Sequence, residues 1–322
     1  MINKISIKKC DDLKSIFKEI HSYISAHIVG STQGFNIAEN LIKVLFCKIY
    51  DERYKEDNEV LEFFALDSNE SYEVKYRIFK IFEKVKNQYS TVFDKSDLID
   101  FSADLIAYIV NRLKYISLME SQRDSIADAF EVFIGNALKG EHGQFFTPRN
   151  VIRFILKYID KNFMPINSKM KIMDPACGTG GFIVEALDFV WKKINISNKN
   201  ELQKQEEKIN FAQTKIYGID KDKFVAKVTK AYMCILGDGT SNVSNKDSLQ
   251  FLEQHYNTVD LLLTNPPFGK KIKIKDTNIL NNYILKSSGQ KGTNPEVLFI
   301  ELSVKLLKEN GIMAIVVPEG II

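Results

Sequence analysis

Two short stretches decide the fold: Asp174-Pro175-Ala176-Cys177-Gly178-Thr179-Gly180-Gly181-Phe182 and Asn265-Pro266-Pro267-Phe268. Each follows an apolar run of strand type, residues 170–173 before the glycines and residues 259–263 before the second stretch. In an open parallel sheet, ligands bind in the crevice at the carboxyl ends of the strands. The two stretches therefore predict an α/β sheet whose strand ends carry the chemistry.

Outward from these stretches, strand-like and helix-like segments alternate. We expect strands at 170–174, 215–219, 259–264 and 311–317, and helices at 181–194, 221–236 and 296–308. This alternation is typical of a Rossmann-like, doubly wound sheet. The polar stretch 195–213 is expected to be a solvated excursion. Thr147 is expected to cap a helix that has Pro148 at its first position.

The first half of the chain shows a different pattern and predicts an all-α domain. Apolar residues recur at helical spacing, glycines are few, and the first proline is Pro148. Residues 97–115 are typical of one long helix. The aromatic residues between Phe63 and Phe82 could form a binding surface, but such a stripe is more typical of core packing. We expect a helical N-terminal domain at 1–138 and the α/β domain at 139–322.

The composition narrows the class of protein. With 45% hydrophobic and 26% charged residues, the chain resembles a globular protein. No apolar run reaches the roughly 18 residues of a membrane span, and the N-terminus lacks the apolar stretch of a secretory signal. Four scattered cysteines and four scattered histidines predict neither disulfides nor a metal site, and favour a reducing cytoplasm.

The charge is unevenly distributed along the chain. Residues 1–140 carry 19 Lys and Arg against 22 Asp and Glu, whereas residues 141–322 carry 25 against 19. The half with the two motifs is therefore the positive half, as expected if it faces phosphates.

The glycine turn predicts a cradle for a nucleoside cofactor. Glycines allow positive φ and let the backbone approach a ligand closely, and the following helix offers unpaired N–H groups. The turn is neither a Walker A loop nor GxGxxG, because Ile183 occupies the third glycine position. Asp220 could accept from both ribose hydroxyls or cap the next helix. Asp174 could fix the loop or reach the amino-acid end of the cofactor, and Cys177 is interpreted as a small turn residue.

The Asn-Pro-Pro-Phe stretch predicts a clamp for a flat ring that bears an amino group. The Asn265 side-chain oxygen and the Pro266 carbonyl can accept both N–H protons, which favours a tetrahedral nitrogen able to attack a methyl group in line. The prolines keep the backbone extended, and Phe268 offers a stacking face worth roughly 1–3 kcal/mol. The alternative is a simple proline-rich turn. Four lysines within 270–275 could contact phosphates or lie in solvent.

On these residues the chain resembles the modification subunit of type I restriction–modification systems, in the N6-adenine DNA methyltransferase superfamily. Besides the two motifs and 218–220, the similar stretches are Asp-Ala-Phe-Glu at 128–131, Gly-Gln-Phe-Phe-Thr-Pro-Arg at 143–149, and residues 311–320. The resemblance implies an S-adenosylmethionine-dependent methyltransferase that methylates N6 of an adenine extruded from double-stranded DNA.

The resemblance also implies partners and site residues. A separate specificity subunit would select the DNA sequence, and a restriction subunit is a further candidate partner; a membrane is not. The implied catalytic residues are Asn265, Pro266, Pro267 and Phe268. The glycine turn itself contributes Asp174 and Gly178 to the expected cofactor site. Together with the residues that the resemblance implies, the expected cofactor-binding residues are Gln144, Phe145, Phe146, Thr147, Pro148, Arg149, Asp174, Gly178, Thr179, Gly180, Gly181, Asp220 and Asp247. Asp247 matches the position that meets the adenine amino group of the cofactor.

Two other functions stay open. Related clamps serve RNA or the glutamine amide of proteins, although residues 144–149 and the helical first half disfavour these substrates. The chain also stops at Ile322, before the final β-hairpin and C-terminal helical region of family members. We therefore expect the C-terminal end of the sheet to be missing, with an unprotected edge, in a fragment, a truncated product or a chain completed by a partner. Such a chain could bind cofactor or partners without turnover.

Overall fold

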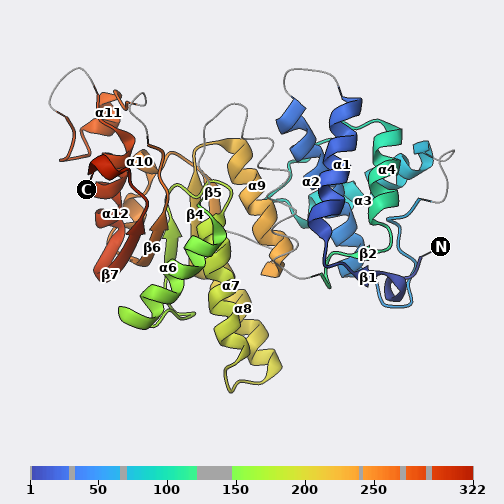
Figure 1. The fold of residues 1–322 in the computed structure, drawn as a ribbon, viewed down its shortest axis with the longest axis horizontal. Coiled ribbons are helices and arrows are strands. Elements are labelled where there is room, and N and C mark those ends of the chain that lie inside the picture. The colour runs from blue at the N-terminus through green and yellow to red at the C-terminus, as the bar shows by residue number, and fades with distance from the viewer. Residues whose placement is uncertain are drawn as a thin grey trace. The chain divides into compact units, whose positions relative to one another are not determined.

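The computed structural model describes residues 2–28, 33–65, 71–121, 147–238, 242–268, 273–287 and 292–321, which fall into two compact units, 1–144 and 145–322 (Figure 1). The expected domain boundary between residues 138 and 139 lies outside the described residues, as do 128–131.

The described part of the first unit is helical, as expected. Its long helices are α1 (Leu13–His27), α2 (Gln33–Tyr54), α3 (Ser71–Gln88) and α4 (Ala103–Leu113), and two-residue strands β1 (Lys8–Lys9) and β2 (Ile116–Ser117) pair in parallel. The helix expected at 97–115 is shorter, because Ser102 ends the preceding coil and caps α4 by accepting from the Leu105 N–H at 3.3 Å.

The aromatic residues of this unit do not all lie in the core. Phe63 and Phe82 are buried, as expected, but Tyr72 and Tyr76 are 82% and 60% exposed. Their spacing of four residues places both on one side of α3, away from its buried face of Val74, Ile78 and Val85. The expectation that all these aromatic residues pack in the core is therefore wrong for these two tyrosines.

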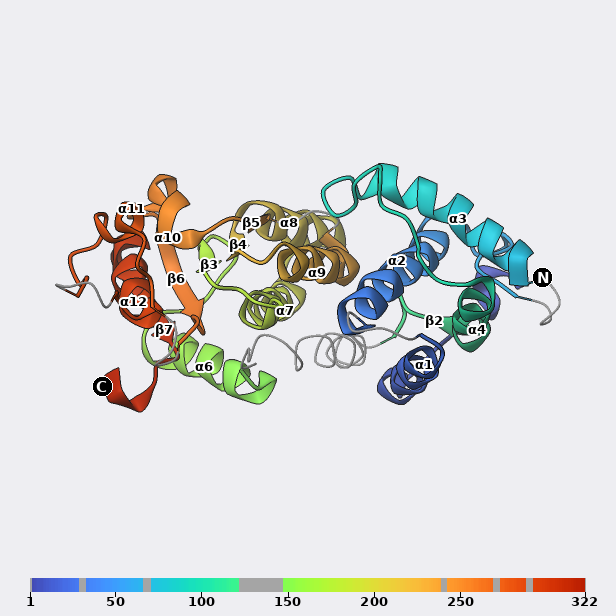
Figure 2. The same ribbon diagram turned by 90° about the horizontal axis from the view of Figure 1, so that it is seen from above.

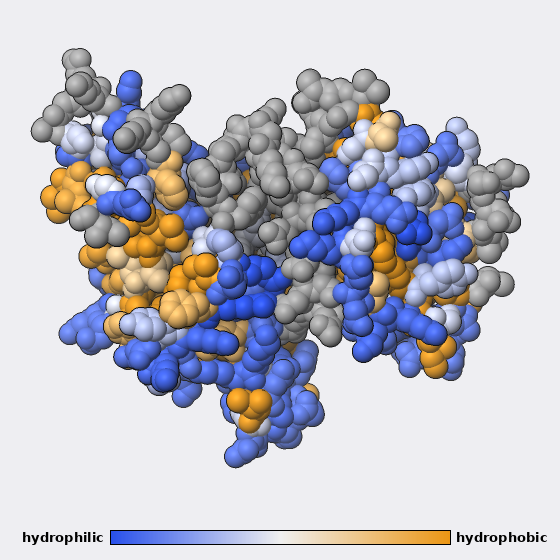
Figure 3. Space-filling view, in the orientation of Figure 1, coloured by the Kyte–Doolittle hydropathy of each residue, from blue (hydrophilic) through white to orange (hydrophobic). Residues whose placement is uncertain are grey.

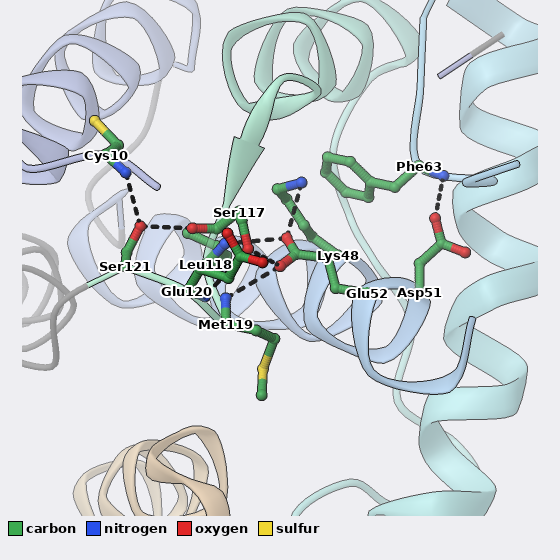
Figure 4. A network of polar contacts seen from close by, with 10 residues as sticks. All are labelled: Cys10, Lys48, Asp51, Glu52, Phe63, Ser117, Leu118, Met119, Glu120 and Ser121. Carbon is green, nitrogen blue, oxygen red and sulfur yellow. Dashed lines mark hydrogen bonds and ion pairs between the residues drawn. The ribbon is translucent and has the colours of Figure 1, made fainter. Parts of the chain in front are cut away.

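A buried ion pair within α2 includes a carboxylate that also connects α2 to β2 and the residues after it (Figure 4). Lys48 Nζ lies 2.9 Å from Glu52 Oε1, and both side chains are almost fully buried. Glu52 also accepts from the Ser117 hydroxyl at 3.0 Å and from the backbone N–H groups of Leu118 and Met119 at 3.1 and 3.0 Å. The carboxylate is thus fully bonded, which a buried charge requires.

The second unit contains a five-stranded sheet in the order β5-β4-β3-β6-β7, and every pairing is parallel. The strands are β3 (Ile172–Asp174), β4 (Ile216–Asp220), β5 (Asn242–Asn245), β6 (Val259–Thr264) and β7 (Leu307–Ile315). Four of them correspond to the expected strands, so the predicted α/β class is confirmed. β5 was not expected.

Helices cover both faces of this sheet. They are α6 (Arg149–Asn162), α7 (Gly181–Asn195), α8 (Glu201–Thr214), α9 (Lys223–Met233), α10 (Ser248–Phe251), α11 (Thr277–Leu280) and α12 (Pro295–Leu306). Figure 2 shows α7 and α9 along one face and α12 on the other, where α10 and α11 also pack. This arrangement is typical of doubly wound folds.

Two local predictions about helices were wrong. The stretch 195–213 contains α8, which packs through Phe211 and Ala212 and is otherwise mostly exposed. Thr147 is not the cap of α6: the helix begins at Arg149, and Pro148 holds the N-cap position in an extended conformation with ψ 136°. A proline cannot offer a capping side chain, so the start of α6 has no side-chain cap.

The strand β7 forms one edge of the sheet among the described residues. Its residues 311–315 are half-buried, whereas β6 beside it is almost wholly buried. In the orientation of Figure 1, apolar side chains reach the surface over β7 and α6 (Figure 3). Within the described ranges, no helix combines the length and apolar character needed to cross a bilayer.

Candidate functional site

The sheet register brings the predicted motifs to one edge. Asp174 is in register with Gly218, two residues before the end of β4, and Met173 is in register with Leu262, two residues before the end of β6. Because all strands are parallel, their carboxyl ends face the same crevice. The glycine turn, Asp220 and the clamp therefore leave neighbouring strands on the same side.

The glycine turn has the backbone conformation that its sequence predicts. Gly178 and Gly180 have φ of 51° and 88°, values that residues with a Cβ rarely adopt. The turn is closed by the Gly180 N–H donating to the Cys177 carbonyl at 2.8 Å, and it is tied to β4 by the Cys177 N–H, which donates to the Ile219 carbonyl at 2.9 Å. The half-buried Thr179 lies between the two glycines, and Gly181 begins α7.

Gly180 is also required for packing. A Cβ at this position would lie 2.7 Å from Thr229 Cγ2, on α9. The Thr229 hydroxyl donates to the Gly178 carbonyl at 2.6 Å, and this bond attaches the turn to α9. At Gly178, by contrast, a Cβ would meet no described residue within 4 Å. In the described part of the chain, the turn is therefore uncovered at Gly178, where a ligand can approach the backbone.

Asp220 connects the end of β4 to the glycine turn. Its Oδ2 accepts from the Gly178 N–H at 3.0 Å and its Oδ1 from the Asp222 N–H at 2.9 Å. The cap of α9 is Asp222, which accepts from the Val225 N–H at 3.0 Å. The capping alternative therefore applies to Asp222 and not to Asp220. Burial raises the pKa of Asp220 above its ordinary value, although these two N–H groups oppose the rise.

Asp174 is buried beneath the turn. It is 1% exposed, and its Oδ1 accepts from the Ala176 N–H at 3.0 Å, which fixes the start of the loop. Burial raises the pKa of Asp174 to about 7, while the Ala176 N–H opposes the rise. Burial likewise raises the pKa of the neighbouring Cys177 thiol, which keeps it protonated and unreactive, as expected of a turn residue.

Asp247 lies at the end of the next strand along the sheet. It follows β5 and caps α10, with Oδ1 accepting from the Leu249 N–H at 3.0 Å. The adjacent Ser248 hydroxyl donates to the Pro175 carbonyl, so α10 is attached to the glycine turn. This contact brings the start of α10, which Asp247 caps, next to the glycine turn.

The clamp directly follows β6. Asn265 and Phe268 are half-buried, Pro266 is buried and Pro267 is exposed. The preceding residue is fixed by the edge strand, because the Thr264 carbonyl accepts from the Val316 N–H at 3.0 Å. The clamp therefore begins from a rigid strand end, and the Oδ1 atom of Asn265 itself is buried. The first two lysines that follow it, at 270 and 271, lie outside the described residues.

The loop expected to line the cofactor is described only at its end. Gln144, Phe145 and Phe146 lie outside the described residues, whereas Thr147 is half-buried and Pro148 exposed. The Arg149 side chain contacts α7, because its Nε donates to Glu185 Oε1 at 2.6 Å. Arg153 Nε donates to the other oxygen at the same distance. Glu185 is 3% exposed, so the pair of arginines joins α6 to α7.

Three contributors to this arrangement were not identified from the sequence: Thr229, Ser248 and Glu185. Thr229 and Ser248 bond to backbone 51 and 73 residues away, so sequence spacing does not reveal them. A signal for Glu185 was available, because it is a lone carboxylate in the apolar stretch 182–187, and two arginines four residues apart precede it. A buried charge of this kind needs a partner.

Three acidic residues end the strands at this edge, and Asp174 is the one buried beneath the turn. Asp174, Asp220 and Asp247 all stand at strand ends, and the glycine turn adds backbone N–H groups beside open space. Acidic side chains suit a ligand that carries positive charge and hydroxyl or amino donors. The backbone N–H donors of the turn suit the acceptor groups of such a ligand. These groups match the donors and acceptors of a small nucleoside of mixed polarity.

Comparison with known proteins agrees with this geometry. Residues 121–322 match the N-6 DNA Methylase family. The chain is 30% identical over 224 residues to the EcoEI type I restriction enzyme methylase subunit of Escherichia coli, an alignment that covers 67% of this chain and 41% of that protein. It is 29% identical over 171 residues to the MjaIX methylase subunit of Methanocaldococcus jannaschii, covering 51% of this chain and 26% of that one.

A solved structure gives the same fold. The type I restriction-modification system methyltransferase subunit from Streptococcus thermophilus matches with a TM-score of 0.64 at 16% identity, covering 96% of this chain and 75% of that one. The chain spans only 41% and 26% of the length of the two curated relatives named above. Because the family match includes 202 of the 322 residues, the chain belongs to the N-6 DNA methylase family, and its resemblance to type I modification subunits is confirmed.

Proposed function

We propose that this chain transfers a methyl group from S-adenosylmethionine to N6 of an adenine extruded from double-stranded DNA, as a modification subunit whose sequence specificity comes from another subunit. The observation that carries the proposal is the position of Asn265 to Phe268 at the end of β6, next to the strand that ends in the glycine turn. Membership of the N-6 DNA methylase family supports the reaction type.

The crevice fits S-adenosylmethionine. This cofactor carries a sulfonium, an ammonium, two ribose hydroxyls and an adenine amino group, all of which suit carboxylate partners. Asp220 would accept from the ribose, and Asp247 from the adenine amino group. The open side of Gly178 would admit the ligand to the turn. When bound, the cofactor supplies an electrophilic methyl group.

The clamp would prepare the amino group for attack. The lone pair of an aryl amine is delocalised into the ring, which makes the nitrogen a weak nucleophile. Asn265 Oδ1 and the Pro266 carbonyl would accept its two N–H protons and so favour a tetrahedral nitrogen with a localised lone pair. Phe268 would stack on the extruded base, worth roughly 1–3 kcal/mol. Preorganised acceptors and alignment would then carry most of the catalysis.

Removal of the amino proton does not depend on the acidic residues. The amino proton becomes acidic as the new carbon–nitrogen bond forms, so no strong base is needed. With a pKa of about 7, Asp174 changes charge near neutral pH, but its burial and its bond to the Ala176 N–H suit a role in fixing the turn. The proton would pass from the nitrogen to a clamp acceptor and then to solvent.

The test is transfer of tritiated methyl groups to unmethylated DNA, with and without the specificity subunit of the same system. We expect Asn265→Ala to lower the rate about 10²–10³-fold while cofactor binding persists. Asn281→Ala, an exposed position just after α11, is the matched control and should leave the rate unchanged. Labelling of RNA or protein but not DNA would favour the alternative substrates. Cofactor binding without any transfer would favour a binding role.

A further inference from the structure

Glu296, in the first turn of α12, carries a buried carboxylate oxygen to which no described residue donates. The residue is 3% exposed. Asn294 Nδ2 donates to Oε1 at 2.9 Å, whereas Oε2 is enclosed and has no hydrogen-bond partner among the described residues. Leaving a buried carboxylate oxygen unbonded is costly. Such an oxygen in a native fold is best explained by a bound group that completes it.

The start of α12 lies at the carboxyl edge of the sheet. The helix connects two parallel strands, β6 and β7, so it begins at the edge where β6 ends. Phe299 belongs to the same hydrophobic cluster as Met173 and Ile219, each of which stands one residue before the end of its strand. Glu296 precedes Phe299 by nearly one helical turn. It therefore lies beyond these strand ends, at the crevice.

The segment after the clamp returns to the same place. Ile274 and Thr293 exchange two backbone hydrogen bonds of 2.8 and 2.9 Å, and the Lys273 ammonium donates to the Asn294 side chain. Lys273 follows Phe268 by five residues, which an extended chain spans in at most about 18 Å. The clamp, at the end of β6, and Glu296, at the start of α12, therefore belong to the same edge of the sheet.

We propose that Oε2 of Glu296 is a ligand contact of this crevice and accepts a hydrogen bond from an N–H group of the bound ligand. The inference rests on the proposed function, which supplies two sources of such a group. One is the ammonium at the amino-acid end of S-adenosylmethionine, and the other is the amino group of the extruded adenine. Both present N–H donors, and the ammonium adds charge attraction.

Glu296→Gln tests the contact with little change in shape. The amide oxygen of glutamine can still accept from Asn294, but the charge and one acceptor are lost. Because an unpaired buried charge disappears, we expect the variant without ligand to be at least as stable as wild type. Its affinity for the ligand that Glu296 contacts should fall about tenfold or more.

Glu301→Gln, on the same helix, is the matched control. Both oxygens of Glu301 are occupied, by the N–H groups of Ile284 and Leu285 at 2.8–2.9 Å and by Lys305 at 2.7 Å. This substitution should lower thermal stability without changing ligand affinity. The two substitutions are therefore expected to have opposite effects: Glu296→Gln weakens ligand binding without loss of stability, and Glu301→Gln lowers stability without weaker binding.

Three ligands separate the two sources. Calorimetry with S-adenosylmethionine and with S-adenosylhomocysteine, both without DNA, tests the ammonium, which the two compounds share. Weaker binding of both to Glu296→Gln assigns the contact to the cofactor. If both bind as in wild type, DNA with adenine or purine at the target position is compared in the complex with the specificity subunit. A preference for adenine that the variant loses assigns the contact to the base.

The remaining outcomes overturn the inference. If Glu296→Gln binds every ligand like wild type, Glu296 is not a ligand contact, and the proposed function is unaffected. If wild type binds no S-adenosyl compound, the proposed function fails and the inference fails with it. A variant that loses stability as Glu301→Gln does, with unchanged binding, shows that Glu296 has a purely structural role.

Discussion

The carboxylate of Asp220, at the end of β4, accepts a hydrogen bond of 3.0 Å from the backbone N–H of Gly178, in the turn that follows β3. This bond joins the ends of two neighbouring strands across the crevice. A residue expected to bind a cofactor therefore also holds the turn on which that cofactor would rest.

Asp220→Asn should weaken both the turn and the cofactor site. Each Asp220 oxygen accepts from a backbone N–H, whereas an asparagine has only one acceptor and would point an NH₂ group at the other N–H. We expect a loss of about 1–3 kcal/mol in the free energy of unfolding, measured by urea denaturation, and weaker S-adenosylmethionine binding by calorimetry. Asp222→Asn is the control, since asparagine caps helices well. Equal effects of the two variants would contradict this role.

Gly180→Ala should destabilise the second unit more than Gly178→Ala. Both positions have positive φ, which costs an alanine roughly 1–2 kcal/mol, but only at Gly180 would the new Cβ collide, at 2.7 Å, with Thr229 Cγ2. Thr229→Ser removes that methyl group and keeps the hydroxyl for the Gly178 carbonyl. The combination of Gly180→Ala with Thr229→Ser should thus recover part of the loss in thermal unfolding, and a purely additive double mutant would refute the collision.

Asp174→Asn should change how stability depends on pH. The pKa of Asp174 is raised to about 7 in the folded protein, against about 3.9 when unfolded, so the folded state binds more protons between these values. Its contribution to stability is complete below about pH 4 and is lost as pH rises through 7. Relative to wild type, the variant should therefore become more stable on going from pH 5 to pH 8, in urea unfolding at both values.

A second buried carboxyl, in the first unit, provides the control for this titration. Burial raises the pKa of Asp51 to about 6. The stability that protonated Asp51 contributes is therefore lost at a lower pH than the contribution of Asp174. Asp51→Asn should change the slope mainly below pH 6, and Asp174→Asn should also change it between pH 6 and 8. Identical profiles for the two variants would argue against the assignment to Asp174.

Lys48→Met should strongly destabilise the first unit. The substitution leaves the Glu52 carboxylate buried without its cation, and breaking a buried pair in this way costs about 3–5 kcal/mol. Lys84→Met, at the half-exposed pair with Glu62, should cost no more than about 1 kcal/mol. Chemical denaturation followed by circular dichroism compares the two. A similar small loss in both would mean that the buried pair contributes little.

The strands and motifs that could be predicted are those with strong apolar patterns. Val259–Thr264 is largely apolar and, apart from the half-buried Asp260, buried, so both its extent and the chemistry at its end follow from the sequence. The strand at 242–245 has the sequence Asn-Val-Ser-Asn, in which only Val243 is buried, and it exists because it pairs with β4. Its apolar content is too low for a pattern to show it.

The site could be predicted as a set of motifs but not as a set of contacts. Whether Asp220 or Asp222 caps α9 depends on where β4 ends, within a margin of two residues. The pairing of Arg149 with Glu185 depends on how two helices pack. Spacing along one helix does not determine which residue of another helix it meets. Local chemistry is therefore readable from the sequence, whereas partners far along the chain are not.

The wholly parallel sheet has a consequence for the order of synthesis. Its central strand, β3, pairs with β6, and the Lys171 and Asp260 that meet at the start of this pairing are 89 residues apart in the chain. Such distant pairings form slowly. On the ribosome, the glycine turn emerges long before the strand that flanks it on one side. The cradle and the clamp can therefore mature only together, once translation has passed Thr264.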